Sequence, residues 1–264
     1  MIDVVDGARP GFLLRHGARL FACPNPHDQV ARMCTSALFA GLSPLECGDI
    51  LCRARTKTFA RYETLFSQGQ PAHTLVWIQT GRVKLAQVTD DGNEVILWVN
   101  GSGDAVDVQG DTVDGSHTCS ARAMDRCQTL VWEYSSFRAL AARYPRINAN
   151  IAKIMAARLC ELEERFCDIA SQRVADRLAL VLLRLAKSVG KQSRGGVELK
   201  LSRRDLAQMT GATVCTISRI LSIWAQLGLV VSRRGGVVIS DPERLRKSPD
   251  PGGADMPRYG GRQI

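Results

Sequence analysis

Apolar and polar positions between residues 57 and 134 follow the short period of β-strands. The apolar runs TLVWIQ, RVKLAQV, EVILWV and QTLVWEY are separated, about every ten residues, by turn signals rich in Gly, Asn and Asp. Several short strands at this spacing predict a small antiparallel barrel or sandwich that hides its edges, and the β-barrel is the form we expect.

The pattern ahead of these strands is helical. In LFAGLSPLECGDIL, Ser43 precedes Pro44 and stands three residues before Glu46, which is the spacing of a capping box. We therefore expect one or two short helices from Leu38 onward. Residues 1–33 mix Gly, Pro and Arg with isolated apolar residues, so the pattern predicts no element for this N-terminal extension.

From Phe137 to about Ile169 the pattern becomes that of helices, and its second half carries a narrow apolar seam. Apolar residues recur there at alternating spacings of 3 and 4, flanked by Glu and Arg. The predicted dimer seam comprises Met155, Leu159, Leu162, Phe166 and Ile169. A charge-flanked seam favours a second, identical helix as its partner. The alternative is a long helix that packs on its own barrel.

The remaining segments combine helices with short strands. Residues 171–189 form an amphipathic pattern, KQSRGG at 191–196 predicts a turn, VELKLS a strand, and VSRRGGVVIS a hairpin around Gly235. From residue 242 the chain is rich in Pro and Gly, and we expect a disordered tail.

Two short helices separated by a glycine lie between that strand and the hairpin. Ser202 caps the first helix with Asp205 at the capping-box position, Gly211 supplies the turn, and the second helix runs from about Thr213 to Leu227. This arrangement predicts a helix-turn-helix, whose second helix enters the DNA major groove.

On that geometry the start of the second helix faces the bases. The candidates for reading bases are Val214, Cys215, Ser218 and Arg219. Arg219 can donate two hydrogen bonds to guanine, although a solvated arginine or a partner of Asp205 is the alternative. The candidates for phosphate contacts are Ser202, Arg203, Arg204, Thr213 and Thr216.

Charge supports this assignment once it is located along the chain. The 264 residues carry a formal net charge of +9, and residues 171–241 hold 12 Lys and Arg against 4 Asp and Glu. A basic excess confined to one segment is typical of a unit that meets a polyanion.

No run of about 18 apolar residues and no secretion signal is visible, so we expect a cytoplasmic protein without a membrane span. The 9 scattered cysteines are expected to be reduced.

These patterns predict an α+β chain with an N-terminal β-barrel, a long dimerisation helix and a C-terminal winged helix-turn-helix. The expected divisions are the extension 1–33, a barrel domain 34–136, a helical segment 137–170, a DNA-binding domain 171–241 and the tail 242–264.

The motifs TGRVKL, DDGNEVIL, GSGD, RVADRLALVLLRLA and SRRDLAQMTGATVCTISRIL, in this order, resemble the Crp/Fnr family of bacterial transcription regulators over roughly residues 38–241. The resemblance implies a cyclic-nucleotide-binding fold for the barrel, a homodimer, and a winged helix reading a palindrome. It also implies action on RNA polymerase at promoters.

The chain departs from the cyclic-nucleotide-binding members at the positions that hold the nucleotide. After Gly103 and Asp104, the places of the Gly-Glu and Arg-Ser pairs are taken by Asp107-Val108 and His117-Thr118. Asp107 and Asp111 would repel a phosphate, and the adenine-facing places on the long helix are Leu162 and Glu163. We therefore expect a regulator that cyclic AMP does not gate.

No cofactor is predicted, and the signal stays open between several candidates. The candidate ligands of an iron–sulfur cluster are Cys23, Cys34, Cys47 and Cys52, whose spacing matches known cluster loops poorly. Cys119 and Cys127 fit ordinary barrel positions. Haem would need His73 or His117. A thiol switch could use Cys160 and Cys167 beside the seam, or Cys215 at the DNA surface, although packing as small, half-buried hydrophobic side chains is the favoured explanation for the first two.

Catalysis is not predicted, because the chain shows no paired carboxylates, metal-ligand spacing, nucleophile elbow or Walker loop. The function expected is sequence-specific regulation of transcription by a homodimer. The alternative is an effector-binding module that acts through a protein partner and binds DNA weakly. In many relatives a glutamate that reads cytosine stands at the position of Cys215, so the target site is expected to differ at that base pair.

Overall fold

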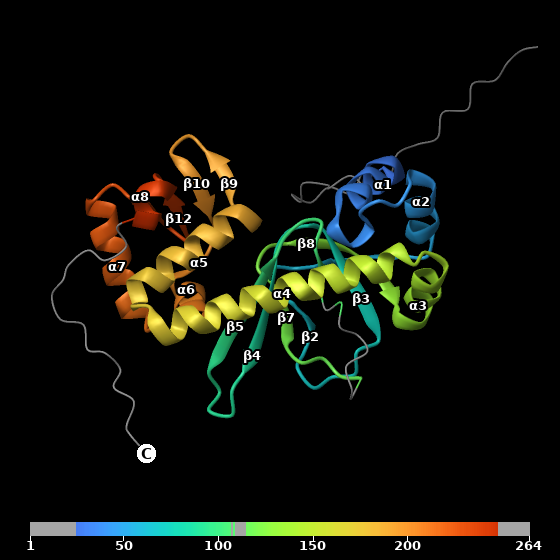
Figure 1. Ribbon diagram of the computed structural model, residues 1–264, viewed down its shortest axis with the longest axis horizontal. Coiled ribbons are helices and arrows are strands. Elements are labelled where there is room, and N and C mark those ends of the chain that lie inside the picture. The colour runs from blue at the N-terminus through green and yellow to red at the C-terminus, as the bar shows by residue number, and fades with distance from the viewer. Residues whose placement is uncertain (1–24, 107, 109–114, 248–264) are drawn as a thin grey trace, which may run out of the picture.

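The computed structural model describes residues 25–106, 108 and 115–247, and Figure 1 shows their arrangement. The described chain starts with α1 (Pro26–Thr35), a short 3-10 helix (Ala37–Phe39) and α2 (Pro44–Cys52). The capping box of Ser43 and Glu46 is present at the start of α2 as predicted. α1 lies partly inside the segment for which no element was predicted; the Asn25 side chain caps it by accepting a hydrogen bond from the His27 N–H.

Eight strands follow in the described residues and form two antiparallel sheets. They are β1 (Arg55–Phe59), β2 (Thr64–Phe66), β3 (Thr74–Thr80), β4 (Val83–Val88), β5 (Glu94–Asn100), β6 (Ala105–Val106), β7 (Ser120–Ala123) and β8 (Cys127–Glu133). One sheet has the order β1-β8-β3-β6 and the other β2-β7-β4-β5. The prediction of a closed barrel is therefore corrected to a jelly-roll-like pair of sheets, here called the two-sheet unit. Strand spacing alone cannot distinguish the two, because it does not reveal which strands pair.

The N-terminal helices and α3 (Tyr134–Arg143) cover an aromatic core. Phe39 lies with its ring centroid 6.2 Å from Trp77 and 6.0 Å from Trp132. The indole N–H of Trp77 donates to Ser36 Oγ and to the Gly103 carbonyl, and that of Trp132 donates to the Ile50 carbonyl, so both buried rings have their polar atom satisfied. These contacts fix the N-terminal helices on the sheet that contains β3.

The long helix α4 (Arg146–Ser171) runs from α3 past both sheets towards the C-terminal unit (Figure 1). Near its start, Asn150 Nδ2 donates to the carbonyls of Leu38 and Ala40. Further along, the guanidinium groups of Arg158 and Arg165 lie over the ring of Trp98, 5.7 Å and 4.8 Å from its centroid. One face of α4 is thus attached to its own chain.

The C-terminal unit packs four helices against a four-stranded sheet. Its elements are α5 (Val174–Ser188), β9 (Lys191–Ser193), β10 (Gly196–Leu199), α6 (Arg203–Thr210), α7 (Val214–Gln226), β11 (Val230–Arg233), β12 (Gly236–Ile239) and α8 (Pro242–Lys247). The predicted hairpin around Gly235 is confirmed, whereas the turn predicted at 191–196 is itself a hairpin of β9 and β10. The first residues of the expected disordered tail form α8, with Asp241 Oδ1 accepting from the Arg244 N–H.

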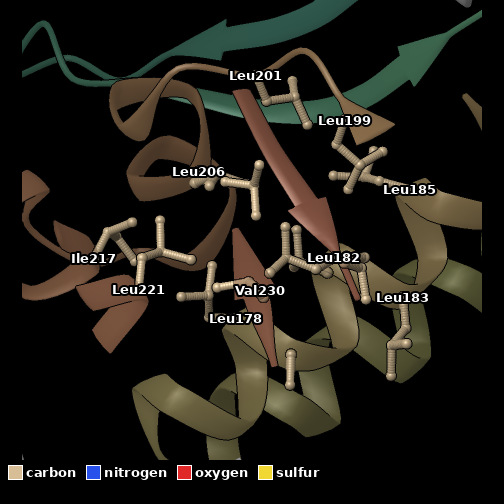
Figure 2. Close-up of a cluster of buried hydrophobic side chains, with 14 of the residues drawn as sticks. Leu178, Leu182, Leu183, Leu185, Leu199, Leu201, Leu206, Ile217, Leu221 and Val230 are labelled. Atoms are coloured by element: carbon tan, nitrogen blue, oxygen red, sulfur yellow. The ribbon is translucent and has the colours of Figure 1, made fainter. Parts of the chain in front are cut away.

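The core of this unit is mostly aliphatic, with Trp224 as its aromatic member, and is shared with the two-sheet unit. Figure 2 shows Leu182 of α5, Leu206 of α6 and Leu221 of α7 as members of one cluster. Ile96 of β5 and Met124 after β7 belong to the same cluster. Because apolar burial is the main favourable term in folding, this shared cluster holds the two units together.

Polar contacts reinforce that junction. Lys84 Nζ lies 3.0 Å from Glu94 Oε2, and Gln208 of α6 donates to the same oxygen at 3.0 Å. Arg82 bridges the units by donating to Asp125 and to the Lys200 carbonyl. Although burial opposes its charge, the Arg82 guanidinium holds the pKa of Asp125 below its ordinary value. The predicted arrangement of elements gave no indication of these contacts.

Candidate nucleic-acid interface

A tight turn joins α6 and α7 in the geometry of a helix-turn-helix. Ser202 Oγ accepts from the Asp205 N–H, and Asp205 Oδ2 accepts from the Ser202 N–H, which completes the predicted capping box. Gly211 ends α6 with φ of 64°, a left-handed conformation that glycine adopts without strain. Thr213 caps α7 by accepting from the Thr216 N–H. The Gly turn and two caps therefore set the angle between the helices.

The two faces of α7 are sharply different. Ile217, Ile220, Leu221 and Trp224 are buried in the core of the C-terminal unit, as predicted. At about 100° per residue, Val214, Ser218 and Arg219 fall on the opposite face within about 140°. Val214 is 44% exposed, while Cys215 and Arg219 are exposed and Ser218 is half-buried. The four candidate base-reading residues thus share one accessible face at the start of α7.

The candidate phosphate-binding residues lie around the beginnings of α6 and α7. Arg204 and Thr213 are exposed, and Arg203 is half-buried. The hydroxyl groups of Thr213 and Thr216 lie 2.9 Å apart. Helix N-termini present backbone N–H groups and a partial positive charge, which favour phosphate. Met209, by contrast, was predicted to face inward and is only half-buried.

Two further features of this surface were not predicted from the sequence. Ser222 is exposed one turn beyond Ser218, on the same face of α7. Arg233 and Arg234 are exposed at the tip of the β11–β12 hairpin. The pair RR next to the Gly235 turn was a visible signal for a basic hairpin tip, and the predicted DNA-binding domain 171–241 contained this hairpin, but neither arginine was named as a contact.

Two family models match the chain. The cyclic nucleotide-binding domain matches residues 56–144, and the Crp-like helix-turn-helix domain matches residues 176–248. Together they cover more than half of the sequence, and they match the two-sheet unit and the candidate interface separately. The chain belongs to the Crp/Fnr family. It is a transcription regulator with a DNA-binding helix-turn-helix, as the resemblance implied.

Relatives of this Crp/Fnr regulator align along most of its length. The CRP-like cAMP-activated global transcriptional regulator of Mycobacterium tuberculosis is 27% identical over 214 residues, covering 80% of this chain and 96% of that protein. Electron transport regulator A of Shewanella oneidensis is 25% identical over 193 residues, covering 72% of this chain and 77% of that protein. Members of the family bind DNA, act as dimers, and are regulators rather than enzymes.

A solved structure shows the same fold. The c-di-GMP responsive global regulator CLP of Xanthomonas campestris superposes with a TM-score of 0.67 at 24% identity, covering 75% of this chain and all of that chain (100%). Within the part of the regulator that the structure describes, no helix has both the length and the apolar character of a membrane span.

The seam of the regulator's α4 is open at its C-terminal end. Leu159, Leu162, Phe166 and Ile169 are 59%, 39%, 73% and 59% exposed, whereas Met155 is half-buried against the N-terminal core. The alternative of packing on the chain's own sheets therefore applies to another face of α4, where Arg165 lies over Trp98, and leaves these four seam residues exposed. Leu162, Phe166 and Ile169 also border an apolar groove of about 350 Å³, whose other walls include Val95 and Met209.

The places that hold nucleotide in other members are only partly described, because Asp107 and Asp111 lie outside the described residues. His117 is buried and stacks on Phe66 with 3.7 Å between ring centroids. Asp104 Oδ2 accepts from the Gly101 N–H. Burial raises the pKa of Asp104, although that hydrogen bond and nearby Arg158 favour its charge. His117 is thus occupied in packing.

The cysteines and histidines named as signal candidates are spread over the molecule. Cys160, Cys167 and Cys215 are exposed, and the first two border a groove of about 560 Å³ between α4 and α5. Cys119 and Cys127 are buried, and His73 is exposed ahead of β3. Among the described residues, no three His, Cys, Asp or Glu side chains gather as a metal site, and Cys23 lies outside this part of the chain.

Proposed function

We propose that this Crp/Fnr regulator acts as a homodimer that recognises a palindromic promoter site in sequence-specific fashion. The observation that supports the proposal most directly is the accessible face formed by Val214, Cys215, Ser218 and Arg219, opposite a fully buried face of the same helix. The open seam of α4 supports the dimer, because contiguous exposed apolar side chains mark interaction sites. Two identical recognition helices read two identical half-sites. Contact with RNA polymerase at the promoter forms part of the same proposal.

We assign the reading of a guanine to Arg219 and the setting of register to the phosphate contacts. Arg219 and Ser218 project from the first two turns of α7, where a recognition helix meets base edges. Cys215 stands where a glutamate reads cytosine in many relatives, and a thiol is only a weak donor and acceptor. Compared with the half-site of those relatives, the half-site of this regulator therefore keeps the guanine and differs at the base pair that the glutamate reads.

A salt titration of DNA binding tests this function. The full-length protein is expected to bind its genomic palindrome at least about 10³-fold more tightly than a scrambled duplex of equal composition and length, measured by fluorescence anisotropy at fixed salt. Both affinities are expected to fall with rising salt, because phosphate contacts release counterions. Equal affinity for the two duplexes would contradict this function and would support the alternative of a module acting through a protein partner.

Cyclic AMP is not the gating signal in this proposal. The described residues at the place of the phosphate-binding pair are His117, which is buried against Phe66, and the exposed Thr118, so neither supplies the guanidinium that neutralises a phosphate. On the long helix, Leu162 offers no hydrogen bond to an adenine. These residues do not fit the nucleotide, and a redox signal remains a component of the proposed function through the exposed cysteines.

Oxidation of Cys215 is expected to weaken DNA binding. Peroxide converts a thiolate to a sulfenate and water, which places a bulkier, charged group on the face that meets DNA. Cys215→Ser is expected to bind the palindrome with unchanged affinity before and after peroxide treatment, whereas the wild-type protein loses affinity. Cys160→Ser, which removes another exposed thiol, on α4, serves as the control and is expected to stay sensitive. If Cys215→Ser remains as sensitive as wild type, another cysteine is responsible.

A further inference from the structure

Two cysteines meet where the first two helices pack together. Cys34 lies in the last turn of α1 and Cys47 lies in the middle of α2. Their sulfur atoms are 3.5 Å apart, and α1 and α2 contact each other along this side. Cys47 is fully buried, whereas Cys34 is half-buried. The pair is therefore enclosed on one side and reachable by a small molecule from the other.

We propose that Cys34 and Cys47 form a reversible intramolecular disulfide when the regulator meets a low-molecular-weight disulfide such as oxidised glutathione. A disulfide needs its sulfur atoms about 2.05 Å apart, so the two side chains must approach by about 1.5 Å. Both cysteines lie on packed helices that already direct their side chains at each other. This site is independent of the DNA-binding surface and of Cys160, Cys167 and Cys215.

The two thiols have different environments, which sets the order of the reaction. Burial, together with the contact with the Cys34 thiol, raises the pKa of Cys47 to about 12. The half-buried Cys34 is therefore the sulfur that reacts first with the external disulfide, and Cys47 is the sulfur that resolves the intermediate.

The reaction balances as two thiol–disulfide exchanges. The Cys34 thiolate attacks one sulfur of oxidised glutathione, which forms a mixed disulfide and releases one glutathione thiolate. That thiolate takes a proton from the solution. Cys47 then loses its proton and attacks the Cys34 sulfur, which releases the second glutathione. In total the protein loses two electrons and two protons, and oxidised glutathione becomes two molecules of glutathione.

The loop that this disulfide closes contains contacts to the rest of the molecule. Between the two cysteines, Ser36 Oγ donates to the Gly103 carbonyl at 2.6 Å, and the carbonyls of Leu38 and Ala40 accept from Asn150 of α4. The bond therefore fastens the segment against which both the Gly103 turn and the long helix are held.

Peptide mapping of the full-length protein tests the proposal. Trypsin leaves Cys34, Cys47 and Cys52 in one peptide, residues 33–53, and cleavage after Glu46 separates Cys34 from the other two. After treatment with oxidised glutathione and blocking of free thiols, fragments 33–46 and 47–53 are expected to stay joined without reductant. Dithiothreitol is expected to separate them. Separate fragments, or glutathione retained on Cys34, would overturn the proposal.

Three variants identify the two cysteines that form the link. Cys52→Ser removes an exposed thiol from the same fragment and is expected to keep the link. Cys47→Ser is expected to lose the link and to retain glutathione on Cys34. Cys34→Ser, at a half-buried position that tolerates the change more readily, is expected to lose the link as well. A link that survives in Cys47→Ser would assign the bond to Cys52 and contradict the geometry. Because the readout is the thiol state, the result does not depend on whether the protein binds its palindrome.

Discussion

Arg219→Ala is expected to lower the preference for the guanine in each half-site by about 5-fold to 150-fold, because one bidentate contact discriminates by about 1–3 kcal/mol. The expectation rests on the exposed position of Arg219 beside Ser218 at the start of α7. The measurement compares the affinity for the palindrome with that for duplexes carrying each alternative base at one position. Non-specific affinity is expected to change far less.

Arg203→Ala is the matched control, since it removes the same charge from a position at the start of α6. This variant is expected to weaken binding to every sequence alike and to flatten the salt dependence by about 0.9 in logarithmic slope for each lost phosphate contact. If Arg219→Ala behaves in the same way and leaves the base preference intact, then α7 does not lie in the groove as we propose.

Phe166→Glu is expected to raise the dissociation constant of the dimer by about 100-fold or more. Two copies of a Phe side chain lose their burial, each worth about 1.5–3 kcal/mol, and two like charges face each other instead. Because Phe166 is 73% exposed within one chain, the monomer is expected to fold normally. Sedimentation equilibrium measures the dissociation constant, and binding to the palindrome is expected to fall while circular dichroism stays unchanged.

Ala157→Glu introduces the same charge on the same helix as a control. This exposed residue precedes Phe166 by nine positions, which places it about 180° around the helix. Its dimer is expected to stay intact. A Phe166→Glu protein that remains dimeric would show that another surface holds the two copies together.

The strongest periodic signals and the capping residues predicted the fold well. The capping boxes of Ser43 and Ser202 and the turn at Gly211 are local features, formed by residues close in sequence, and the structure contains all three. α1 was missed because its apolar face is short, formed by Val30, Met33 and Cys34, although Asn25, Pro26 and Asp28 were visible start signals. Closure of the sheets depends on pairing between distant strands, which periodicity does not encode.

The candidate interface was predicted largely because a helix-turn-helix concentrates its function in one short segment. The helical period determines which residues of α7 share a face, so Val214 and Arg219 could be placed on the exposed face from the sequence. The contact between Cys34 and Cys47 could not, because it depends on how two helices pack. The same is true of Gln208, whose bond to Glu94 joins segments that are far apart in the chain.

The aliphatic cluster shared by the two units bears on how the DNA specificity of this regulator can be re-engineered. Ala86, Ile96 and Met124 of the two-sheet unit pack into the same cluster as Leu182 and Leu206. A transplanted DNA-binding segment from a relative would have to match the shape of those three side chains, since overpacking and cavities both cost stability. Substitutions on the exposed face of α7 leave this cluster unchanged, so replacing single side chains there costs less stability than exchanging the whole segment.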